Sequence, residues 1–139
     1  MSQYEKSNIF NKILAGEIPS TNIFENDDAL VIMDVMPVSR GHCLVIPKAP
    51  SRNLLDADAK TLSNIMPIVQ QIAKATKKAL QADGIIIQQF NEESAGQTVF
   101  HLHFHIIPTF AGQKPARHAD KMADPKQLKE IATLIAAQM

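Results

Sequence analysis

The sequence predicts an α+β fold in which helices pack on a five-stranded antiparallel sheet. Five short apolar runs are spaced as strands along the 139 residues, and most of them are joined by short polar turns, which favours antiparallel pairing. One long segment between the third and fourth runs instead has apolar residues at helical spacing. Two shorter helical segments lie near the ends of the chain. We therefore expect one long helix, two shorter helices and one sheet.

Length and composition fit one domain over residues 1–139 that forms its own core. Fourteen basic residues balance fourteen acidic ones, so the net charge does not favour nucleic-acid binding. The longest apolar run, Ala29–Met33, is far shorter than a membrane span. The single cysteine, Cys43, and a polar start, MSQYEKSNIF, predict a cytoplasmic protein with no membrane partner.

The first half of the chain is expected to hold a short helix and three strands. The helix covers Asn8–Gly16, which has an apolar side and ends on a glycine. Two apolar runs, Asn22–Glu25 and Ala29–Val35, flank the turn-forming residues Asn26–Asp28 and predict a hairpin. The third strand is His42–Lys48.

The long helix is expected within Asp56–Asp83, where Pro67 should kink it or mark its start. Its apolar residues recur at helical spacing: Leu62, Ile65, Met66, Val69, Ile72, Ala73, Thr76 and Leu80. The remaining strands are Gly84–Phe90 and Val99–Pro108. The last helix begins at Asp124-Pro125, a cap followed by a proline, and its apolar stripe is Leu128, Ile131, Leu134 and Ile135.

Three of the five histidines alternate with apolar residues in the fifth predicted strand. On a strand, His101, His103 and His105 would point to one face, while Leu102 and Phe104 would point into the core. Three imidazoles concentrated on one face indicate a functional site. Two kinds of site remain open at this point: a metal site, or a phosphate site in which one imidazole is the nucleophile.

The residues around the histidines favour phosphate chemistry. His-x-His on a strand is a known zinc arrangement, but the sequence offers no obvious second ligand cluster. Before the histidines, Gly96 allows close backbone approach, and Gln97 and Thr98 supply donors suited to a phosphate oxygen. A neutral imidazole can attack phosphorus, and protonated neighbours such as His105 or His42 would stabilise the negative charge.

The segment GQTVFHLHFHIIP resembles the defining motif of the histidine triad (HIT) family, His-φ-His-φ-His-φ-φ. The resemblance extends back to IFNKILAGEIPSTNIFENDDALVIMDVMPVSRGHCLVIPK and covers a core of residues 9–108, followed by a C-terminal extension and helix over residues 109–139. It implies a HIT-like fold and a homodimer whose two sheets join. It also implies a nucleotide hydrolase or transferase that acts at the α-phosphorus.

The resemblance assigns roles to five residues around the motif. His103 matches the nucleophile, which becomes a covalent nucleotidyl-histidine. His101 matches the residue whose backbone carbonyl orients His103, and His105 matches a phosphate contact. Gln97 and Thr98 match contacts to the phosphate and the leaving group.

Other matched positions concern the rest of the nucleotide. His42 matches a fourth histidine beside the triad, Asp34 the carboxylate that holds the ribose hydroxyls, and Asn91 a polar loop residue near the phosphate. The apolar slot for the base matches Ile9, Phe10, Ile13, Ile32 and Val35. Spacing alone favours a plain core role for the first three, and Asp34 could be only a turn former.

One departure from the family pattern concerns zinc. Many bacterial members carry Cys-x-x-Cys where this chain has Asn8-Ile9-Phe10-Asn11, and a histidine where it has Pro50. Because neutral amide oxygens are poor zinc ligands, we expect no structural metal and no cofactor.

Together these observations predict a HIT-family nucleotide hydrolase that releases an AMP-like nucleoside monophosphate. The substrate is expected to be a phosphoramidate or a dinucleoside polyphosphate such as a diadenosine polyphosphate, with a purine base. The alternative is a nucleotide-binding or scaffolding protein with weak catalysis. A metal-binding module that uses the three histidines is a third possibility.

Overall fold

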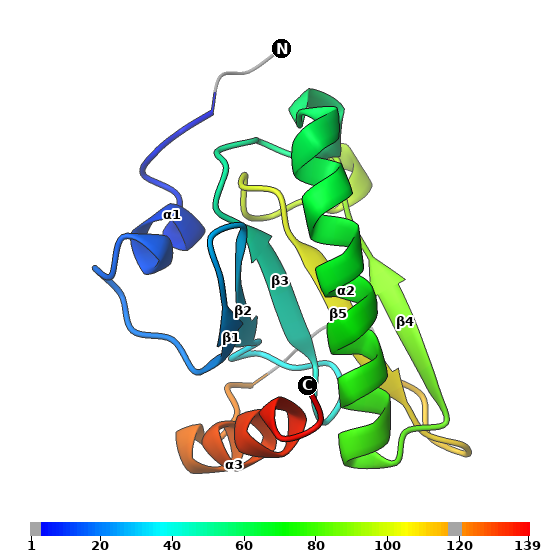
Figure 1. Ribbon diagram of the computed structural model, residues 1–139. Helices are drawn as coiled ribbons and strands as arrows, with labels where there is room; N and C mark the ends of the chain where they lie inside the picture. The colour runs from blue at the N-terminus through cyan, green and yellow to red at the C-terminus, as the bar shows by residue number, and fades with distance from the viewer. Residues whose placement is uncertain (1–3, 117–120) are drawn as a thin grey trace.

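The structure is a computed structural model that describes residues 4–116 and 121–139 (Figure 1). Residues 117–120 of the C-terminal extension lie outside the described residues. The elements follow one another in this order: α1 (Ile9–Leu14), β1 (Asn22–Glu25), β2 (Ala29–Met33), β3 (Cys43–Pro47), a 3-10 turn (Leu54–Asp56), α2 (Ala59–Leu80), β4 (Gly84–Gln88), a second 3-10 turn (Glu93–Ala95), β5 (Phe104–Thr109) and α3 (Pro125–Ala136).

The five strands form one antiparallel sheet in the order β1-β2-β3-β5-β4. The α2 helix connects β3 to β4 and runs along the sheet, so that β5 fills the place between these two strands (Figure 1). β1 and β4 are the edges. The predicted α+β class, the five strands and the three helices are confirmed.

Each face of the sheet carries its own apolar layer. On the first face, residues such as Val31, Val45 and Ile106 form a core with α2 and α3. On the second face, four strand residues pack against Phe10 of α1: Leu30, Ile32, Leu44 and Ile46. Leu44 is paired with His105, and paired residues share a face. The histidines therefore belong to the second face, beside α1.

Three expectations about the helices need correction. Pro67 does not begin α2, because one continuous helix runs from Ala59 to Leu80. One missing N–H is tolerated there because buried residues on both sides of Pro67, Ile65 and Val69, hold the helix on the sheet. Met66 and Leu134 were placed in apolar stripes but are 47% and 45% exposed. Each is adjacent in sequence to a buried isoleucine and is therefore rotated about 100° away from the core.

The fifth strand is shorter than predicted. It begins at Phe104 rather than Val99 and ends at Thr109. The residues before Phe104 leave the sheet and bond elsewhere: the Leu102 N–H donates to the Ser51 carbonyl oxygen, and the His101 carbonyl oxygen accepts from the His103 ring. The chain is therefore irregular along most of the histidine motif. Among the described residues, no helix has the length and apolarity needed to cross a membrane.

Candidate active site

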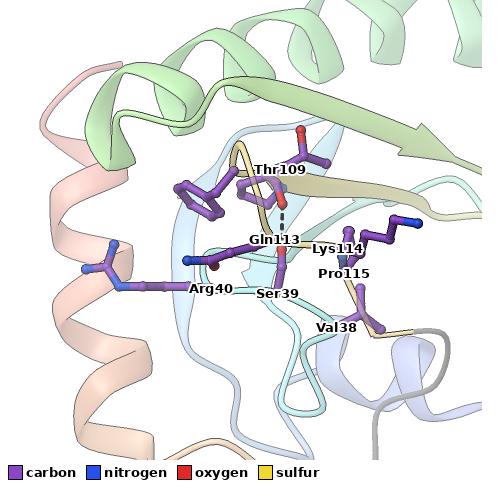
Figure 2. A pocket seen from close by; sticks show the side chains of 9 residues that line it. Val38, Ser39, Arg40, Thr109, Gln113, Lys114 and Pro115 are labelled. Atoms are coloured by element: carbon purple, nitrogen blue, oxygen red, sulfur yellow. Dashed lines mark hydrogen bonds between the residues drawn. The ribbon is translucent and has the colours of Figure 1, made fainter.

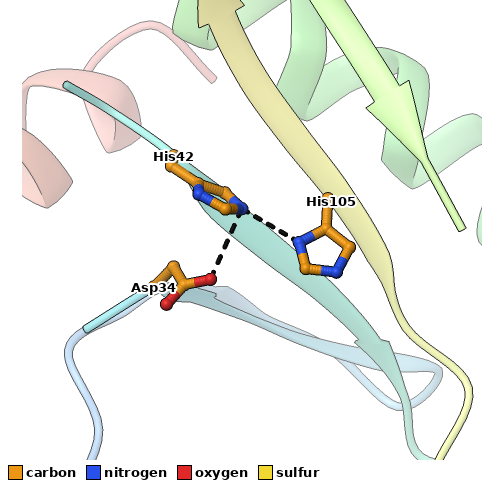
Figure 3. Close-up of side chains that lie close together, drawn as sticks. All are labelled: Asp34, His42 and His105. Atoms are coloured by element: carbon orange, nitrogen blue, oxygen red, sulfur yellow. Dashed lines mark hydrogen bonds and ion pairs between the residues drawn. The ribbon is translucent and has the colours of Figure 1, made fainter. Parts of the chain in front are cut away.

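Histidines from β3 and β5 meet an aspartate on the second face of the sheet. His42 lies directly before β3, His105 lies in β5, and Asp34 directly follows β2. The His42 Nε2 atom is 2.9 Å from His105 Nδ1 and 3.4 Å from Asp34 Oδ2 (Figure 3). The ring of His103 completes the group, with its centroid 5.0 Å from that of His105.

His103 has the geometry of a nitrogen nucleophile. Its Nδ1 atom lies 2.6 Å from the His101 carbonyl oxygen. A carbonyl oxygen can only accept, so Nδ1 carries the proton and Nε2 of the neutral ring keeps a free lone pair. Burial lowers the pKa of His103 to about 4, so the ring is neutral at pH 7. Phe10 packs edge-on against the ring, with centroids 4.7 Å apart.

His101 contributes its backbone rather than its ring to this group. Its Nε2 atom lies 2.7 Å from the Pro47 carbonyl oxygen and must donate to it. Its Nδ1 atom therefore accepts from the Tyr4 hydroxyl at 2.5 Å. The His101 side chain is buried, and burial lowers its pKa. Because this ring is fully engaged by Pro47 and Tyr4, the three rings of the motif do not act as one set of ligands.

The proton positions on His42 and His105 follow from one backbone amide. The Val38 N–H donates to His42 Nδ1 at 3.1 Å. A neutral His42 therefore carries its proton on Nε2 and donates to His105 Nδ1, which leaves His105 with an Nε2–H donor. Burial lowers the pKa of both histidines to about 4. The expectation that protonated His42 or His105 supplies positive charge is wrong at neutral pH, where the two rings are neutral and His105 offers an N–H donor.

Asp34, His42 and His105 also have ligand atoms within 4.8 Å of one another, a spacing that a metal ion could bridge. The ligand types suit zinc. A metal-binding histidine, however, normally donates its second ring N–H to an acceptor. His42 Nδ1 instead faces the Val38 N–H donor, so its Nε2 atom retains a proton. The donor set fits a hydrogen-bonded chain and does not fit a metal site.

Asp34 has the hydrogen bond of a turn former, and its binding of ribose stays a prediction. Its Oδ1 atom accepts from the Met36 N–H at 2.8 Å, which is the bond of a turn former. Its Oδ2 atom faces the His42 ring. Burial raises the pKa of this carboxyl group. The second oxygen retains acceptor capacity beside the histidines.

Gln97 has a structural position that differs from the expected phosphate contact. It is buried, and both amide hydrogens donate to carbonyl oxygens, those of Arg52 and Val99. Its oxygen accepts from the Asn53 side chain and from the Glu92 N–H. The amide thus has no hydrogen left for a phosphate. Its neighbour Thr98 is exposed, and a contact between Thr98 and a phosphate stays a prediction.

Asn91 bonds to Gln89 in its own loop and to Leu54 in the first 3-10 turn. Its oxygen accepts from the Leu54 N–H and from the Gln89 amide, and its nitrogen donates back to Gln89. It supports the loop that ends at Thr98. A direct contact between Asn91 and a phosphate stays a prediction.

The five residues expected to form the base slot lie around α1 and β2. Phe10 and Ile32 are buried in one cluster, with Ile13 packed against it. Ile9 and Val35 are 47% and 46% exposed. Two exposed apolar side chains thus accompany a buried apolar cluster, and a base slot formed by these five residues stays a prediction.

The sequence did not identify Arg52, Asn53 and Glu92 as residues that support the site. Arg52 makes two hydrogen bonds of 2.9 Å to the Glu92 carboxylate and lies 4.2 Å from the Phe100 ring centroid. Asn53 is buried and also donates to Glu92. Nothing in local spacing could have revealed these pairs, because their members are about 40 residues apart.

A separate cavity of about 150 Å³ lies beside the loop that precedes β3 and the end of β5 (Figure 2). Its lining includes Ser39, which donates to the Pro108 carbonyl oxygen at 2.7 Å, and two cations, Arg40 and Lys114. The cations extend in different directions from it (Figure 2). None of the histidines described above, His42, His101, His103 and His105, lines this cavity.

Comparison with known proteins places this geometry in a family. The family model "HIT domain" matches residues 15–112. A solved HIT-like protein from Bartonella henselae, described as involved in cell-cycle regulation and containing an unknown ligand, is 49% identical, with a TM-score of 0.96 over 99% of this chain and 100% of that one. A zinc-bound histidine triad protein from Mycobacterium smegmatis is 35% identical, with a TM-score of 0.83 over 95% and 92% of the two chains.

Among curated relatives, the adenylylsulfatase HINT3 of Arabidopsis thaliana is 34% identical over 120 residues, which are 82% of this chain and 61% of that protein. The suspected resemblance is thereby confirmed over most of the sequence. The chain belongs to the histidine triad family.

Proposed function

We propose that the protein is a nucleotide hydrolase or transferase in which His103 attacks the α-phosphorus. One observation carries the proposal: the His101 carbonyl oxygen holds the proton on His103 Nδ1 and leaves the Nε2 lone pair free. HIT-family proteins are generally nucleotide hydrolases or transferases, and the Arabidopsis relative is an adenylylsulfatase, so membership itself suggests nucleotide hydrolysis. The position of attack is our own inference.

The reaction runs in two displacements. The Nε2 lone pair of His103 forms a bond to the α-phosphorus, and the bond from phosphorus to the leaving group breaks. The leaving group departs with the electron pair and takes up a proton from solvent. The resulting nucleotidyl-imidazolium keeps its Nδ1–H on the His101 carbonyl oxygen, which stabilises the positive charge. Water then attacks phosphorus, the P–N bond breaks, and a nucleoside monophosphate and a proton are released.

Neutral hydrogen-bond donors stabilise the phosphoryl oxygens in this proposal. His105 offers its Nε2–H because His42 occupies its Nδ1 atom, and Thr98 offers an exposed hydroxyl. Asp34 accepts from the ribose hydroxyls, and the apolar residues around α1 and β2 receive a purine base. Suitable substrates are nucleoside phosphoramidates and dinucleoside polyphosphates, whose α-phosphorus carries a leaving group.

The test compares the native protein with His103→Ala on adenosine 5′-phosphoramidate. We expect turnover to fall by about three orders of magnitude or more, since the bond-forming atom is lost. AMP affinity, measured by calorimetry, should change little because base and ribose contacts lie elsewhere. Rapid acid quench and mass spectrometry of the native protein should map an adenylyl group to His103. An adduct on His101 or His105, or substantial turnover by the variant, contradicts the proposal.

We also infer that two copies join through β4. This strand pairs only with β5 within the described chain and exposes Ile87, which is 44% accessible. An open apolar edge strand invites pairing with another strand. Light scattering should give twice the chain mass of 15.3 kDa for the native protein. Ile87→Glu should be monomeric, whereas Met66→Glu, a matched change on the exposed side of α2, should remain dimeric. A dimer that survives Ile87→Glu places the interface elsewhere.

A further inference from the structure

We propose that Tyr4 is a positioning residue for the nucleophile, acting through the ring and backbone of His101. This inference rests on the proposed function, in which His103 attacks phosphorus. Neither the HIT motif nor the predicted slot includes Tyr4, which lies 97 residues before His101 in the chain. Its hydroxyl nevertheless bonds to His101 in the site.

The contact between Tyr4 and His101 has two components. The Tyr4 hydroxyl lies 2.5 Å from His101 Nδ1, and the two rings meet edge to face with centroids 5.5 Å apart. Since the His101 proton is held on Nε2 by the Pro47 carbonyl oxygen, Nδ1 can only accept, and the hydroxyl is the donor. The His101 residue is fully buried. Removal of the hydroxyl would leave a buried lone pair without a partner.

Two hydrogen bonds connect Tyr4 through His101 to the attacking ring of His103, and a third holds His101 on Pro47. The hydroxyl and the Pro47 carbonyl oxygen hold the two nitrogens of the His101 ring at opposite ends. The ring in turn fixes the position of the His101 backbone, whose carbonyl oxygen accepts from His103 Nδ1 at 2.6 Å. That last bond determines which nitrogen of His103 is free to attack. If the His101 ring could rotate, its carbonyl oxygen would no longer keep the proton on His103 Nδ1.

The segment that carries Tyr4 is itself held in place. Two side-chain amides at the start of α1 donate to its backbone: Asn8 to the Glu5 carbonyl oxygen at 2.7 Å and Asn11 to the Lys6 carbonyl oxygen at 2.9 Å. The Asn8 side-chain oxygen also caps α1 by accepting from the Asn11 N–H. Phe10, two residues after Asn8, packs on the His103 ring. Residues 4–10 therefore contact two histidines of the motif, His101 through Tyr4 and His103 through Phe10.

The substitution Tyr4→Phe tests the proposal because it keeps the aromatic ring and removes only the hydroxyl. With adenosine 5′-phosphoramidate, we expect kcat to fall about tenfold, the effect of one lost hydrogen bond at a buried acceptor. KM should change by no more than about twofold, because Tyr4 does not touch the nucleotide. Nitrogen-15 spectra of the imidazoles should show one tautomer of His103 in the native protein, with the proton on Nδ1, and a mixture in the variant.

A stability control separates positioning from simple loss of structure. Asp124→Ala removes the side chain that caps α3, away from the histidines. It should lower the melting temperature without changing kcat at 25 °C or the His103 spectrum. If Tyr4→Phe behaves in the same way, Tyr4 is merely structural and the proposal is wrong.

The two proposals fail in different ways. If the native protein turns over no phosphoramidate or dinucleoside polyphosphate, the proposed function fails, and the spectra alone decide whether Tyr4 controls the His103 tautomer. An unchanged His103 spectrum in Tyr4→Phe, or a native His101 with its proton on Nδ1, overturns the positioning role whatever the activity.

Discussion

Backbone groups determine the tautomers of His42, His101 and His103. His42 in turn determines that of His105. The carbonyl oxygens of Pro47 and His101 can only accept, and the Val38 N–H can only donate. Each imidazole that meets one of them has a single allowed tautomer while it is neutral. Two free atoms remain for substrate, the lone pair of one ring and the N–H of another. In the proposed reaction, the lone pair is the nucleophile and the N–H is a donor to the phosphoryl oxygens.

Asp34 gives a prediction at the residue scale, because only one of its oxygens is used by the Met36 turn. If Oδ2 binds ribose, AMP should bind more tightly than 2′,3′-dideoxy-AMP by about 1–3 kcal/mol, the penalty for leaving a buried acceptor unpaired. Asp34→Asn keeps the turn-forming oxygen and should narrow this difference. Calorimetric titration of both nucleotides measures it. Equal affinity of the native protein for the two nucleotides would show that Asp34 forms the turn and does not bind ribose.

At the scale of elements, the irregular segment before β5 owes its shape to polar contacts with the segment after β3. Gln97 joins the two through bonds to Arg52 and Asn53, and the Arg52–Glu92 pair closes the same connection on its exposed side. A regular strand could not hold His101 and His103 in this way, since its backbone carbonyl groups would pair with a neighbour. The residues that we propose to act in catalysis therefore include ones where the backbone is irregular.

Substitutions at two adjacent residues of this segment, Gln97 and Thr98, should affect different properties: the first stability and the second turnover. Gln97→Leu removes four hydrogen bonds and leaves their buried partners unpaired. Urea unfolding should therefore show that the free energy of unfolding falls by about 2–4 kcal/mol. Thr98→Ala alters an exposed side chain and should change stability by less than about 0.5 kcal/mol, yet it should lower turnover if the hydroxyl binds phosphate. A stable Gln97→Leu protein would show that the network contributes little. Full activity in Thr98→Ala would remove Thr98 from the site.

For the whole molecule, the buried histidines couple stability to pH. His42, His103 and His105 have a pKa lowered to about 4 in the folded protein, against 6.5 when exposed. Between these values the unfolded chain binds more protons, so stability is complete above pH 6.5 and is lost as the pH falls toward 4. One such histidine contributes up to about 3 kcal/mol over this range.

Urea unfolding at several pH values between 7.5 and 4.5 measures this coupling. We expect the free energy of unfolding of the native protein to decrease steadily below pH 6.5. His103→Ala removes one of the titrating groups and should reduce the slope. The kcat/KM of the native protein should fall on acidification near pH 4 rather than near pH 6.5, because attack requires a neutral His103. A flat stability curve from pH 7 to 5 would show that the histidines are not buried as neutral groups in solution.

The sequence by itself determined the fold class, the approximate positions of the helices and strands, and the motif that belongs to the HIT family. Apolar periodicity and turn residues are local properties of the chain, and they report which side of each element is buried. The same locality explains the errors. Met66 and Leu134 lie at the margins of their stripes, and the histidine alternation looks like a strand from Val99 onward although pairing starts at Phe104.

Only the tertiary structure decided how the site is built. The role of Gln97 depends on Arg52 and Asn53, about 45 residues away, and the role of Tyr4 depends on His101, 97 residues away. Which nitrogen of each histidine carries the proton depends on which backbone atom faces it. These are contacts between distant segments, and residue type and spacing do not encode them, because a given imidazole can donate or accept until its neighbour is in place.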